Sequence, residues 1–573
     1  IQKPGSVTEG FITRGSPGER PSFAQLCAFS LDLTRADGAC QAGLMRSVRA
    51  ISRVSPKRGW VLGLAGLLLA ASVGGAGCSE SSDAQSKPKD GGASGSGGIT
   101  GDSATPTDAA QSDGSTVVPV PGSAECAWTP GERPTAALPT VHTKEHVIDL
   151  KQWQISNTGT DPVETRTKLN DAIKWAKDKG YDKIVIPPGT YLVGEATNDA
   201  YAGGIDLQGD MTLELSQGTV IKMAPTDPWN YCVINVDDHS NVTIRGGEVV
   251  GDRDKHDYGS PPDAHDEGHA ICVWTGVDRV LIENMKLHEV TGDGVLILGV
   301  KANGTTAEKA TTNVTIRNNE IFHNRRQGVS IVGGHNIVIE KNKIHDIGGT
   351  SPEFGIDIEG AGRSDKDVWI YQNDFHDNAG GDFVTSSGRN VWLEENTLIQ
   401  CGVNAQGQFD PALPCLLPKQ VDGPIIIWKE TDNVIINNKI RMSMPTVNGY
   451  WGILGYVSSK DQSPTRTNKV GNYIAGNTLY DAGIHMAYNM RYFVSNNTLH
   501  NGLILGEDLA CTRLENNRIN RTKKEHYKLR NVAGVAHGNI LNKSEGAIPS
   551  EDIPMKFPMA NDAPYRNSSP VFW

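Results

Sequence analysis

The chain has 573 residues, a formal net charge of −12 at pH 7, 64 glycines and only 6% aromatic residues. A nucleic-acid-binding protein needs a basic face, so this charge argues against that class. The length exceeds that of an ordinary single domain, but a repeat architecture is free of that limit.

The N-terminal part carries the features of an export signal. We take Met45 as a credible start site and residues 1–44 as a non-native or unstructured extension. Basic residues follow Met45, and then comes an apolar run that is too short to span a bilayer. Small residues and Cys78 end the segment, so residues 45–78 are predicted to be a signal peptide.

The ending GAGC (75–78) resembles a bacterial lipobox, although Gly75 stands where that motif has a larger aliphatic residue. The resemblance implies a lipid anchor at Cys78, which would be the chain's only membrane attachment, and an outer-membrane or cell-surface lipoprotein. Periplasmic or extracellular release is the alternative.

Residues 79–123 consist mainly of Ser, Gly, Asp, Pro and Thr, which cannot bury enough apolar surface to fold. We therefore predict a disordered tether, a folded domain over 124–545 and a tail over 546–573. Six cysteines follow the tether, and an even number in an exported protein permits disulfides. Cys401 and Cys415 bracket one loop and are the favoured pair.

The folded domain repeats one pattern. An alternating apolar pair, an Asn and a further apolar residue recur in NVTIRNNEIFHNRRQGVSI (313–331), NIVIEKNKIHDIGGTSPEFGIDI (336–358), DVWIYQNDFHDNAGGDFV (367–384) and NVWLEENTLIQ (390–400). Alternation predicts strands, and self-similarity at this period predicts a solenoid. Asn tolerates the left-handed conformation of a tight corner and can hydrogen-bond along a stack. The predicted Asn column comprises Asn319, Asn342, Asn373, Asn396, Asn438, Asn477, Asn497 and Asn517.

Coils of this kind resemble the right-handed parallel β-helix of the pectate-lyase superfamily, and the resemblance covers about 147–520. The segment ETRTKLNDAIKWAKDKGYDKIVIPPGTYLV (164–193) matches the family's entry, an amphipathic capping helix followed by a PPGTY strand. The helix is expected to bury Leu169, Ala172, Ile173 and Ala176. The fold class predicted is all-β, a parallel β-helix with an N-terminal capping helix.

The resemblance places the substrate groove on the outer face of the first strand of each coil, at 291–297, 324–331, 353–360 and 380–386. Because Ile356 and Ile358 alternate inward, Asp357 and Glu359 should face outward, roughly 6.6 Å apart. Neighbouring coils are about 4.8 Å apart, which brings Arg325 and Arg326 within reach of Asp357.

Asp293 lies one coil beyond, and Asp382 lies on the coil at the other side, where either Phe383 or Val384 could be the inward residue. Outward acids often serve only to solvate a surface. However, other outward groove positions are uncharged, namely Leu296, Ser330 and Thr385. Acids and arginines that gather among them form a candidate catalytic site.

A long insertion, GDRDKHDYGSPPDAHDEGHA (251–270), is expected to hang over the same face. It is rich in titratable side chains: Asp252, Asp254, His256, Asp257, Tyr258, Asp263, His265, Asp266, Glu267 and His269. It could supply a catalytic base at His265, or simply be a solvated polar loop. Carboxylates suit Ca²⁺, so Asp254, Asp266 and Glu267 are a candidate cation site. The candidate substrate-binding residues are Arg326, Trp428, Lys429, His256 and Tyr258, since aromatic rings can stack on sugars.

The motifs GDR, GDGV, NRRQG and GIDIE resemble a bacterial β-helix group allied to pectate lyases and glycoside hydrolase family 28, which implies a polysaccharide-active enzyme. We favour a lyase acting on an acidic glycan. Arg325 and Arg326 would bind a uronate carboxylate, and one of them or His265 would remove the C5 proton.

Three alternatives stay open. A hydrolase would use Asp357 with Glu359 or Asp293 as paired carboxylates, although Gln327-Gly328 replaces the Gly-His-Gly of polygalacturonases. A C5-epimerase is suggested because FGIDIE resembles the YGFDPHE stretch of mannuronan epimerases. There Phe354 replaces the tyrosine and Glu359 falls at the histidine. A glycan-binding surface protein would use the groove without catalysis.

Overall fold

The structure is a computed structural model that describes residues 126–194, 204–259, 265–303, 305–399, 423–428, 431–441, 451–456, 471–487, 491–520, 527–543 and 546–548. The predicted extension, signal peptide and tether, including Cys78, lie outside these residues. So do Lys429, the Cys401–Cys415 pair and the tail beyond 548. Within the described ranges, no helix is both long and apolar enough to cross a membrane.

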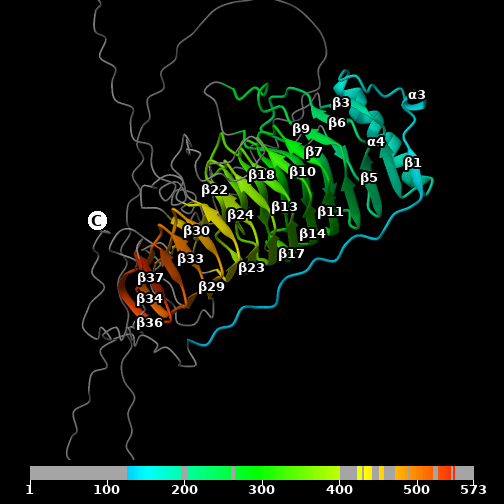
Figure 1. The fold of residues 1–573 in the computed structure, drawn as a ribbon. Coiled ribbons are helices and arrows are strands. Elements are labelled where there is room, and N and C mark those ends of the chain that lie inside the picture. Colours follow the sequence, from blue (N-terminus) through cyan, green and yellow to red (C-terminus); the bar gives the residue numbers. More distant parts are fainter. Residues whose placement is uncertain are drawn as a thin grey trace, which may run out of the picture. The chain divides into compact units, whose positions relative to one another are not determined.

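Three ladders of parallel strands stack into successive coils (Figure 1). We call the first the groove ladder. Its strands are β4 (Ile205–Asp206), β7 (Asn230–Asp237), β10 (Glu267–Trp274), β13 (Asp293–Leu298), β16 (Gln327–Val332), β19 (Phe354–Ile358), β22 (Gly381–Thr385), β25 (Ile425–Trp428), β28 (Trp451–Tyr456), β31 (Gly483–Ala487) and the first parts of β34 (Ile504–Glu515) and β36 (Tyr527–His537).

The second, the strap ladder, forms the next side of each coil. Its strands are β1 (Glu145–Val147), β2 (Lys183–Ile186), β5 (Met211–Leu215), β8 (Val242–Arg245), β11 (Asp278–Glu283), β14 (Thr311–Arg317), β17 (Gly334–Glu340), β20 (Asp365–Tyr371), β23 (Gly388–Glu394), β26 (Asn433–Ile436), β29 (Asn472–Ala475), β32 (Tyr492–Ser495) and the ends of β34 and β36.

The third ladder closes each coil. It contains β3 (Gly189–Val193), β6 (Thr219–Met223), β9 (Glu248–Val250), β12 (Lys286–His288), β15 (Glu320–Phe322), β18 (Lys343–His345), β21 (Asp374–His376), β24 (Thr397–Ile399), β27 (Lys439–Arg441), β30 (Thr478–Tyr480), β33 (Thr498–His500), β35 (Arg518–Asn520), β37 (Ile540–Lys543) and the antiparallel β38 (Gly546–Ile548). The predicted all-β solenoid is thus confirmed.

The capping helix is present as α4 (Pro162–Asp178), preceded by the short α3 (Leu150–Trp153). Proline in the first turn of α4 suits the helix start, where a backbone N–H has no partner. Leu169, Ala172, Ile173 and Ala176 are all buried, as their helical spacing predicts. The helix therefore covers the first coils with an apolar face.

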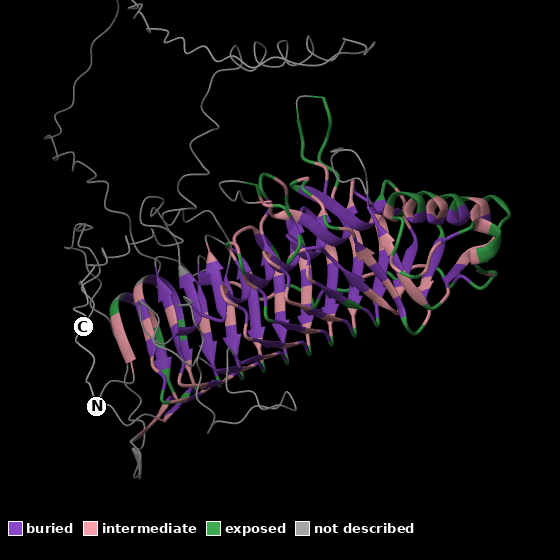
Figure 2. Ribbon diagram, turned by 90° about the horizontal axis from the view of Figure 1, so that it is seen from above, coloured by how far each residue is buried: buried purple, intermediate pink, exposed green. Residues whose placement is uncertain are grey.

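The coil interior is filled by inward aliphatic side chains that stack on their counterparts in the next coil. Val295, Val329, Ile356 and Phe383 follow one another in register and are fully buried. Buried residues follow the strands, while exposed ones gather in the turns between them (Figure 2). Each coil is thus stabilised mainly by its two neighbours.

The predicted Asn column is confirmed between the strap ladder and the third ladder. Asn373 Nδ2 donates to Asn396 Oδ1 at 3.0 Å and to Ile339 O at 2.8 Å, and the same pattern runs from Asn319 through Asn517 to Asn539. The left-handed residue is the one before each ladder Asn, such as Gln372 (φ 53°), and not the Asn itself. The ladder Asn side chains act as hydrogen-bonding links between coils.

Residues 126–144 form a strap that runs along the strap ladder toward α4 (Figure 1). Cys126 at its start is bonded to Cys511 in β34. Arg133 lies over the rings of Trp369 and Trp392, at 5.3 and 5.6 Å. Further along, Thr140 N donates to Asn241 Oδ1 at 2.6 Å. The strap covers the outer side of this ladder.

Candidate active site

Asp357 occupies the outer face of the groove ladder. In this column, Leu296, Ser330, Asp357 and Val384 follow one another in register, while Ile356 and Ile358 point into the core. Asp357 is therefore flanked along the groove by uncharged side chains, and it is only 4% exposed. Its outward direction agrees with the alternation seen in the sequence.

The surroundings of Asp357 favour its protonated form. Burial raises the pKa of Asp357 well above its usual range, and the neighbouring Glu359 raises it further. Arg326 and a hydrogen bond from Gln327 oppose that shift without cancelling it. A carboxyl group in such a setting holds its proton to higher pH than a solvated one and can act as a general acid.

Arg326 connects the acids of the site. Its Nη1 lies 3.2 Å from Asp293 Oδ2, its Nη2 lies 3.4 Å from Glu359 Oε1, and its Nε lies 3.6 Å from Asp266 Oδ2. Burial alone would lower the pKa of Arg326, but these carboxylates together raise it, so the guanidinium stays charged. The guanidinium of Arg326 thus links acids from β13, from the insertion and from the residue after β19.

Gln327 begins β16 and is fully buried. Its Nε2 donates to Asp357 Oδ2 at 2.5 Å, and its Oε1 accepts from Phe354 N at 3.1 Å. Both ends of the amide are fixed, so the Asp357 carboxyl is held in one orientation. The sequence indicated no role for Gln327, because its partners come from the next coil.

His269 is a second residue that sequence reasoning named but gave no role. It is fully buried in β10. Its Nδ1 accepts from Asp293 N at 3.1 Å, and its Nε2 faces Glu267 Oε2 at 3.4 Å. We assign the ring proton to Nε2 from this network. His269 therefore fixes the backbone that presents the Asp293 carboxylate to Arg326.

The insertion lies against the same end of the groove. His256 Nε2 and His265 Nδ1 are 2.9 Å apart, and the guanidinium of Arg325 lies 4.4 Å from the centre of the Tyr258 ring. Arg325 Nη1 also donates to His265 O at 3.5 Å. The structure thus brings together Asp293, Arg325, Arg326, Asp357 and Glu359 with His256, Tyr258, His265 and Asp266.

Asp382 has a hydrogen-bond partner outside this group. Phe383 is the inward residue of β22 and Val384 the outward one, so alternation alone would turn Asp382 outward. Asp382 is fully buried and accepts from Asn378 Nδ2 at 3.0 Å. Thr385 was expected to face outward, but it lies in the inward column between Ile358 and Ile427.

Trp428 lies on the same outer face as Asp357, two coils further along, and the predicted cation ligands lie in and beside the insertion. Trp428 packs against a small apolar cluster of Phe354, Val384 and Ile426 on the outer face of the sheet. Among the residues that the structure describes, no three His, Cys, Asp or Glu side chains converge as metal ligands. Asp254 is exposed, while Asp266 faces Arg326 and Glu267 faces His269, so these three acids do not form a cation site.

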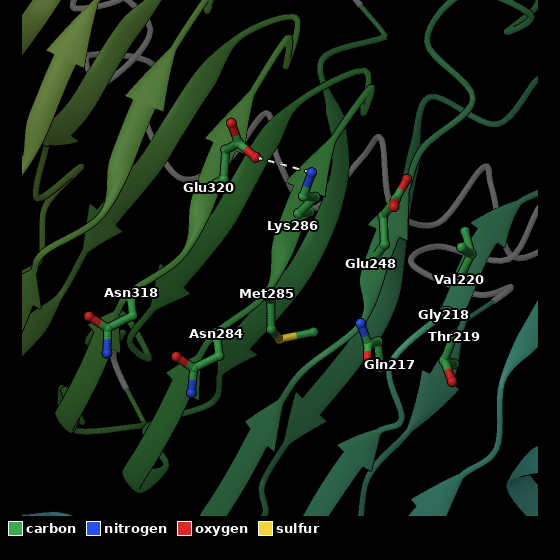
Figure 3. Close-up of a pocket in the computed structure, with 11 residues that line it drawn as sticks. Gln217, Gly218, Thr219, Val220, Glu248, Asn284, Met285, Lys286, Asn318 and Glu320 are labelled. Atoms are coloured by element: carbon green, nitrogen blue, oxygen red, sulfur yellow. Dashed lines mark ion pairs between the residues drawn. The ribbon is translucent and has the colours of Figure 1, made fainter. Parts of the chain in front are cut away.

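A pocket of about 490 Å³ opens on the third ladder, near β6, β9, β12 and β15 (Figure 3). Lys286 and Glu320 point toward one another across its rim and form an ion pair at 3.4 Å. None of the predicted site residues lines it. The concentration of buried acids and histidines on the groove ladder, rather than this pocket, identifies the candidate active site.

Sequence comparison gives one family match. A family model described as "Right handed beta helix region" matches residues 199–398 and 307–451. The chain is 31% identical over 271 residues to the uncharacterized protein YclG of Bacillus subtilis and 27% identical over 269 residues to the SPbeta prophage-derived uncharacterized protein YorA of the same organism. Each match takes 44% of this chain and 45% or 46% of the relative, so the chain spans about half the length of these relatives.

Among solved structures, the chain is similar to the A-module of the mannuronan C-5 epimerase AlgE6 of Azotobacter vinelandii, with a TM-score of 0.51 and 16% identity over 69% of this chain and 98% of that one. It is also similar to PfbA, a surface adhesin of Streptococcus pneumoniae, with a TM-score of 0.38 and 13% identity over 70% and 94%. At these identities the likeness concerns the fold. The stacked coils and the family match together show that the chain is a right-handed parallel β-helix protein.

Proposed function

We propose that this protein is a polysaccharide-active enzyme that cleaves a uronate-containing glycan by β-elimination in the groove over β16 and β19. The observation that carries the proposal is the buried Asp357, whose surroundings raise the pKa of its carboxyl group, beside the guanidinium of Arg326. A neutral acid in the groove floor can give its proton to the leaving oxygen. It also leaves that part of the floor without a charge that would repel a uronate.

Arg326 is suited to receive the substrate's carboxylate. Its contacts with Asp266, Asp293 and Glu359 are 3.2–3.6 Å long, whereas tight charge-assisted bonds are about 2.7–2.9 Å. Glu359 is also the most exposed of these partners, with 41% of its side chain accessible. A substrate carboxylate could displace Glu359 and form a bidentate pair with the guanidinium.

The proton at C5 of the uronate needs a base near this pair. His265 lies beside Asp266, which contacts Arg326, and its backbone oxygen accepts from Arg325. We assign the base to His265, because the Arg325 guanidinium stacks on Tyr258 and stays charged near neutral pH.

Hydrolysis is the second candidate, and a specific spacing favours it. Asp357 lies in β19 and Glu359 follows its last residue, and two positions in an extended chain place the two Cα atoms roughly 6.6 Å apart. Carboxyl separations of roughly 6.5–9.5 Å suit inversion, with one acid protonating the leaving group and the other activating water. In that reaction Asp357 keeps its role as acid and Glu359 is the base.

One structural neighbour is named as a mannuronan C-5 epimerase, which is compatible with a glycan substrate. That likeness is in fold, so epimerisation and simple binding remain outcomes for the assay to find. The localisation proposal, export with a lipid anchor at Cys78, rests on the sequence motif.

The test is an assay of acidic and neutral polysaccharides that follows ultraviolet absorbance and reducing ends in parallel. An unsaturated uronate absorbs, so both signals should rise together. Reducing ends without absorbance would replace the lyase with the hydrolase. Tight binding with neither signal would replace cleavage with epimerisation or binding, and proton exchange at C5 would separate those two.

A further inference from the structure

Three side chains of the insertion form a hydrogen-bonded chain that ends at the candidate site. Asp252 Oδ2 lies 3.0 Å from His256 Nδ1, and His256 Nε2 lies 2.9 Å from His265 Nδ1. The side chains of Asp252 and His256 are both fully buried, whereas His265 is half-buried. The series therefore runs from the interior outward to His265.

The donors and acceptors along this chain define the tautomers. Asp252 Oδ2 accepts from Thr226 N at 2.9 Å, so it is an acceptor toward His256 Nδ1 as well. A neutral His256 must then carry its proton on Nδ1, which leaves Nε2 to accept from His265 Nδ1–H. As a result, a neutral His265 has no proton on Nε2.

We propose that Asp252 and His256 are positioning residues, which hold His265 in this tautomer so that its Nε2 takes the proton from C5 of the bound uronate. This inference rests on the proposed function. The logic is that of a buried acid that orients an imidazole base, here extended by one more imidazole. Nothing in the spacing of Asp252, His256 and His265 within an insertion indicated a hydrogen-bonded series.

The contacts around His265 support a functional position. Its φ is +36°, in the left-handed region that many corner residues of these coils share, so its contacts and not its φ carry the argument. Here Arg325 Nη1 donates to His265 O, and Asp266, the next residue, faces Arg326. His265 is thus held where the imidazole series meets the carboxylate cluster.

The groups named above account for every proton in the elimination step. His265 Nε2 takes the C5 proton, the electron pair forms the C4–C5 double bond, and the bond from C4 to the leaving oxygen breaks. Asp357 gives its proton to that oxygen. The imidazolium is stabilised through His256 by Asp252. It then releases its proton to solvent, and solvent returns one proton to Asp357, so both groups regain their starting states. No oxidant or other reactant is needed.

A pH effect at His265 must be weighed against every charged group around it. His256 and Asp252 lie behind its ring, Tyr258 and Arg325 pack beside it, and Asp266 follows it in the chain. Arg325 disfavours the imidazolium and Asp252 favours it. Removing the Asp252 charge should therefore leave the imidazolium form of His265 less stabilised.

The first readout is independent of activity. Nitrogen chemical shifts of the histidine rings in the full chain should show His265 protonated at Nδ1 and bare at Nε2 in the wild type. Asp252→Asn should change that tautomer distribution, whereas Asp257→Asn, an exposed acid of the same insertion, should not. A His265 proton on Nε2 in the wild type would overturn the proposal, even if the enzyme were active.

The second readout is the pH profile of cleavage. His265→Gln should lose about 10²- to 10⁴-fold in kcat, as expected for a general base. Asp252→Asn should move the acidic limb of the pH–rate profile to lower pH. Asp252→Glu keeps the charge, so its acidic limb should lie close to that of the wild type. If Asp252→Asn folds and its acidic limb stays where it is in the wild type, the proposed positioning role of Asp252 and His256 is wrong. Wild-type protein inactive on every glycan would overturn the proposed function, while the nitrogen shifts would still report on that positioning role.

Discussion

The side-chain amide of Gln327 donates to Oδ2 of Asp357 at 2.5 Å and accepts from the backbone of the same strand. Because the bond is strongest to the ionised carboxylate, it lowers the pKa of Asp357 from the value that burial and Glu359 would set. One neutral residue on the neighbouring coil thus adjusts the strength of the candidate acid.

Replacing Gln327 with Leu should therefore raise the pKa of Asp357 further. Loss of the protonated acid limits activity at high pH, so the alkaline limb of the pH–rate profile should move to higher pH. The profile of kcat/KM for glycan cleavage measures this. Ser330→Ala, at the preceding position of the outward column, is the control and should leave the limb in place. A limb that moved to lower pH in Gln327→Leu would contradict the assignment.

Asp357→Asn should stabilise the fold at neutral and alkaline pH. The folded-state pKa of Asp357 lies above its unfolded value. Its effect on stability is therefore absent below the unfolded pKa, near 4, and destabilises the protein as pH rises toward the folded pKa. Thermal unfolding of both proteins between pH 4 and pH 9 checks this. The two Tm values should agree at low pH and diverge as pH rises, and a variant that is less stable at pH 9 would contradict it.

Arg326→Ala should destabilise the protein. Asp293 is fully buried, and its carboxylate would lose the guanidinium at 3.2 Å. Breaking a buried pair by removing one partner costs about 3–5 kcal/mol. Arg326→Lys keeps the charge but cannot reach three carboxylates with a planar fork, so it should recover only part of the loss. Urea unfolding gives the difference, and an Arg326→Ala protein as stable as the wild type would show that the cluster does not hold the coils together.

Much of the fold could be predicted from the sequence because the repeat is local. Each ladder Asn and each alternating strand follows from residues within one coil, and Asn319 through Asn517 all hydrogen-bond as predicted. The register of β22 could not be predicted, since Phe383 and Val384 are both apolar and alternation alone does not distinguish them. Asp382 was a candidate groove residue, and in the structure it is fully buried and accepts from Asn378 Nδ2, a contact that alternation does not reveal.

The candidate site was predictable only in part. In FGIDIE the alternation of inward isoleucines predicts that Asp357 faces outward. The distance between neighbouring coils predicts that Arg326 lies close to it. The partners of Gln327 and His269 depend on how neighbouring coils are offset, which the sequence does not encode locally. The same holds for the disulfides, because Cys126 and Cys511 are 385 residues apart and Cys232 pairs with Cys272 across adjacent strands.

The strap provides a prediction about stability alone. Cys126→Ser removes the covalent tie between the strap and β34, and losing a native disulfide typically costs about 2–5 kcal/mol. The loss should lower the temperature of unfolding and expose the strap to proteolysis between Cys126 and Lys144. Arg133→Ala, which removes the contacts with Trp369, Trp392 and Glu394, should act in the same direction but less strongly. Unchanged protease resistance in Cys126→Ser would contradict this role.

The central claim is that Asp357 is a catalytic acid and not merely a polar contact in a binding groove. The most direct measurement compares glycan turnover with glycan affinity in Asp357→Asn, with the wild type beside it. We predict that kcat falls at least about 10²-fold while Kd stays within a few-fold, because the amide fits the same space. Full turnover by Asp357→Asn, or a loss of affinity with no turnover in either protein, would contradict the account.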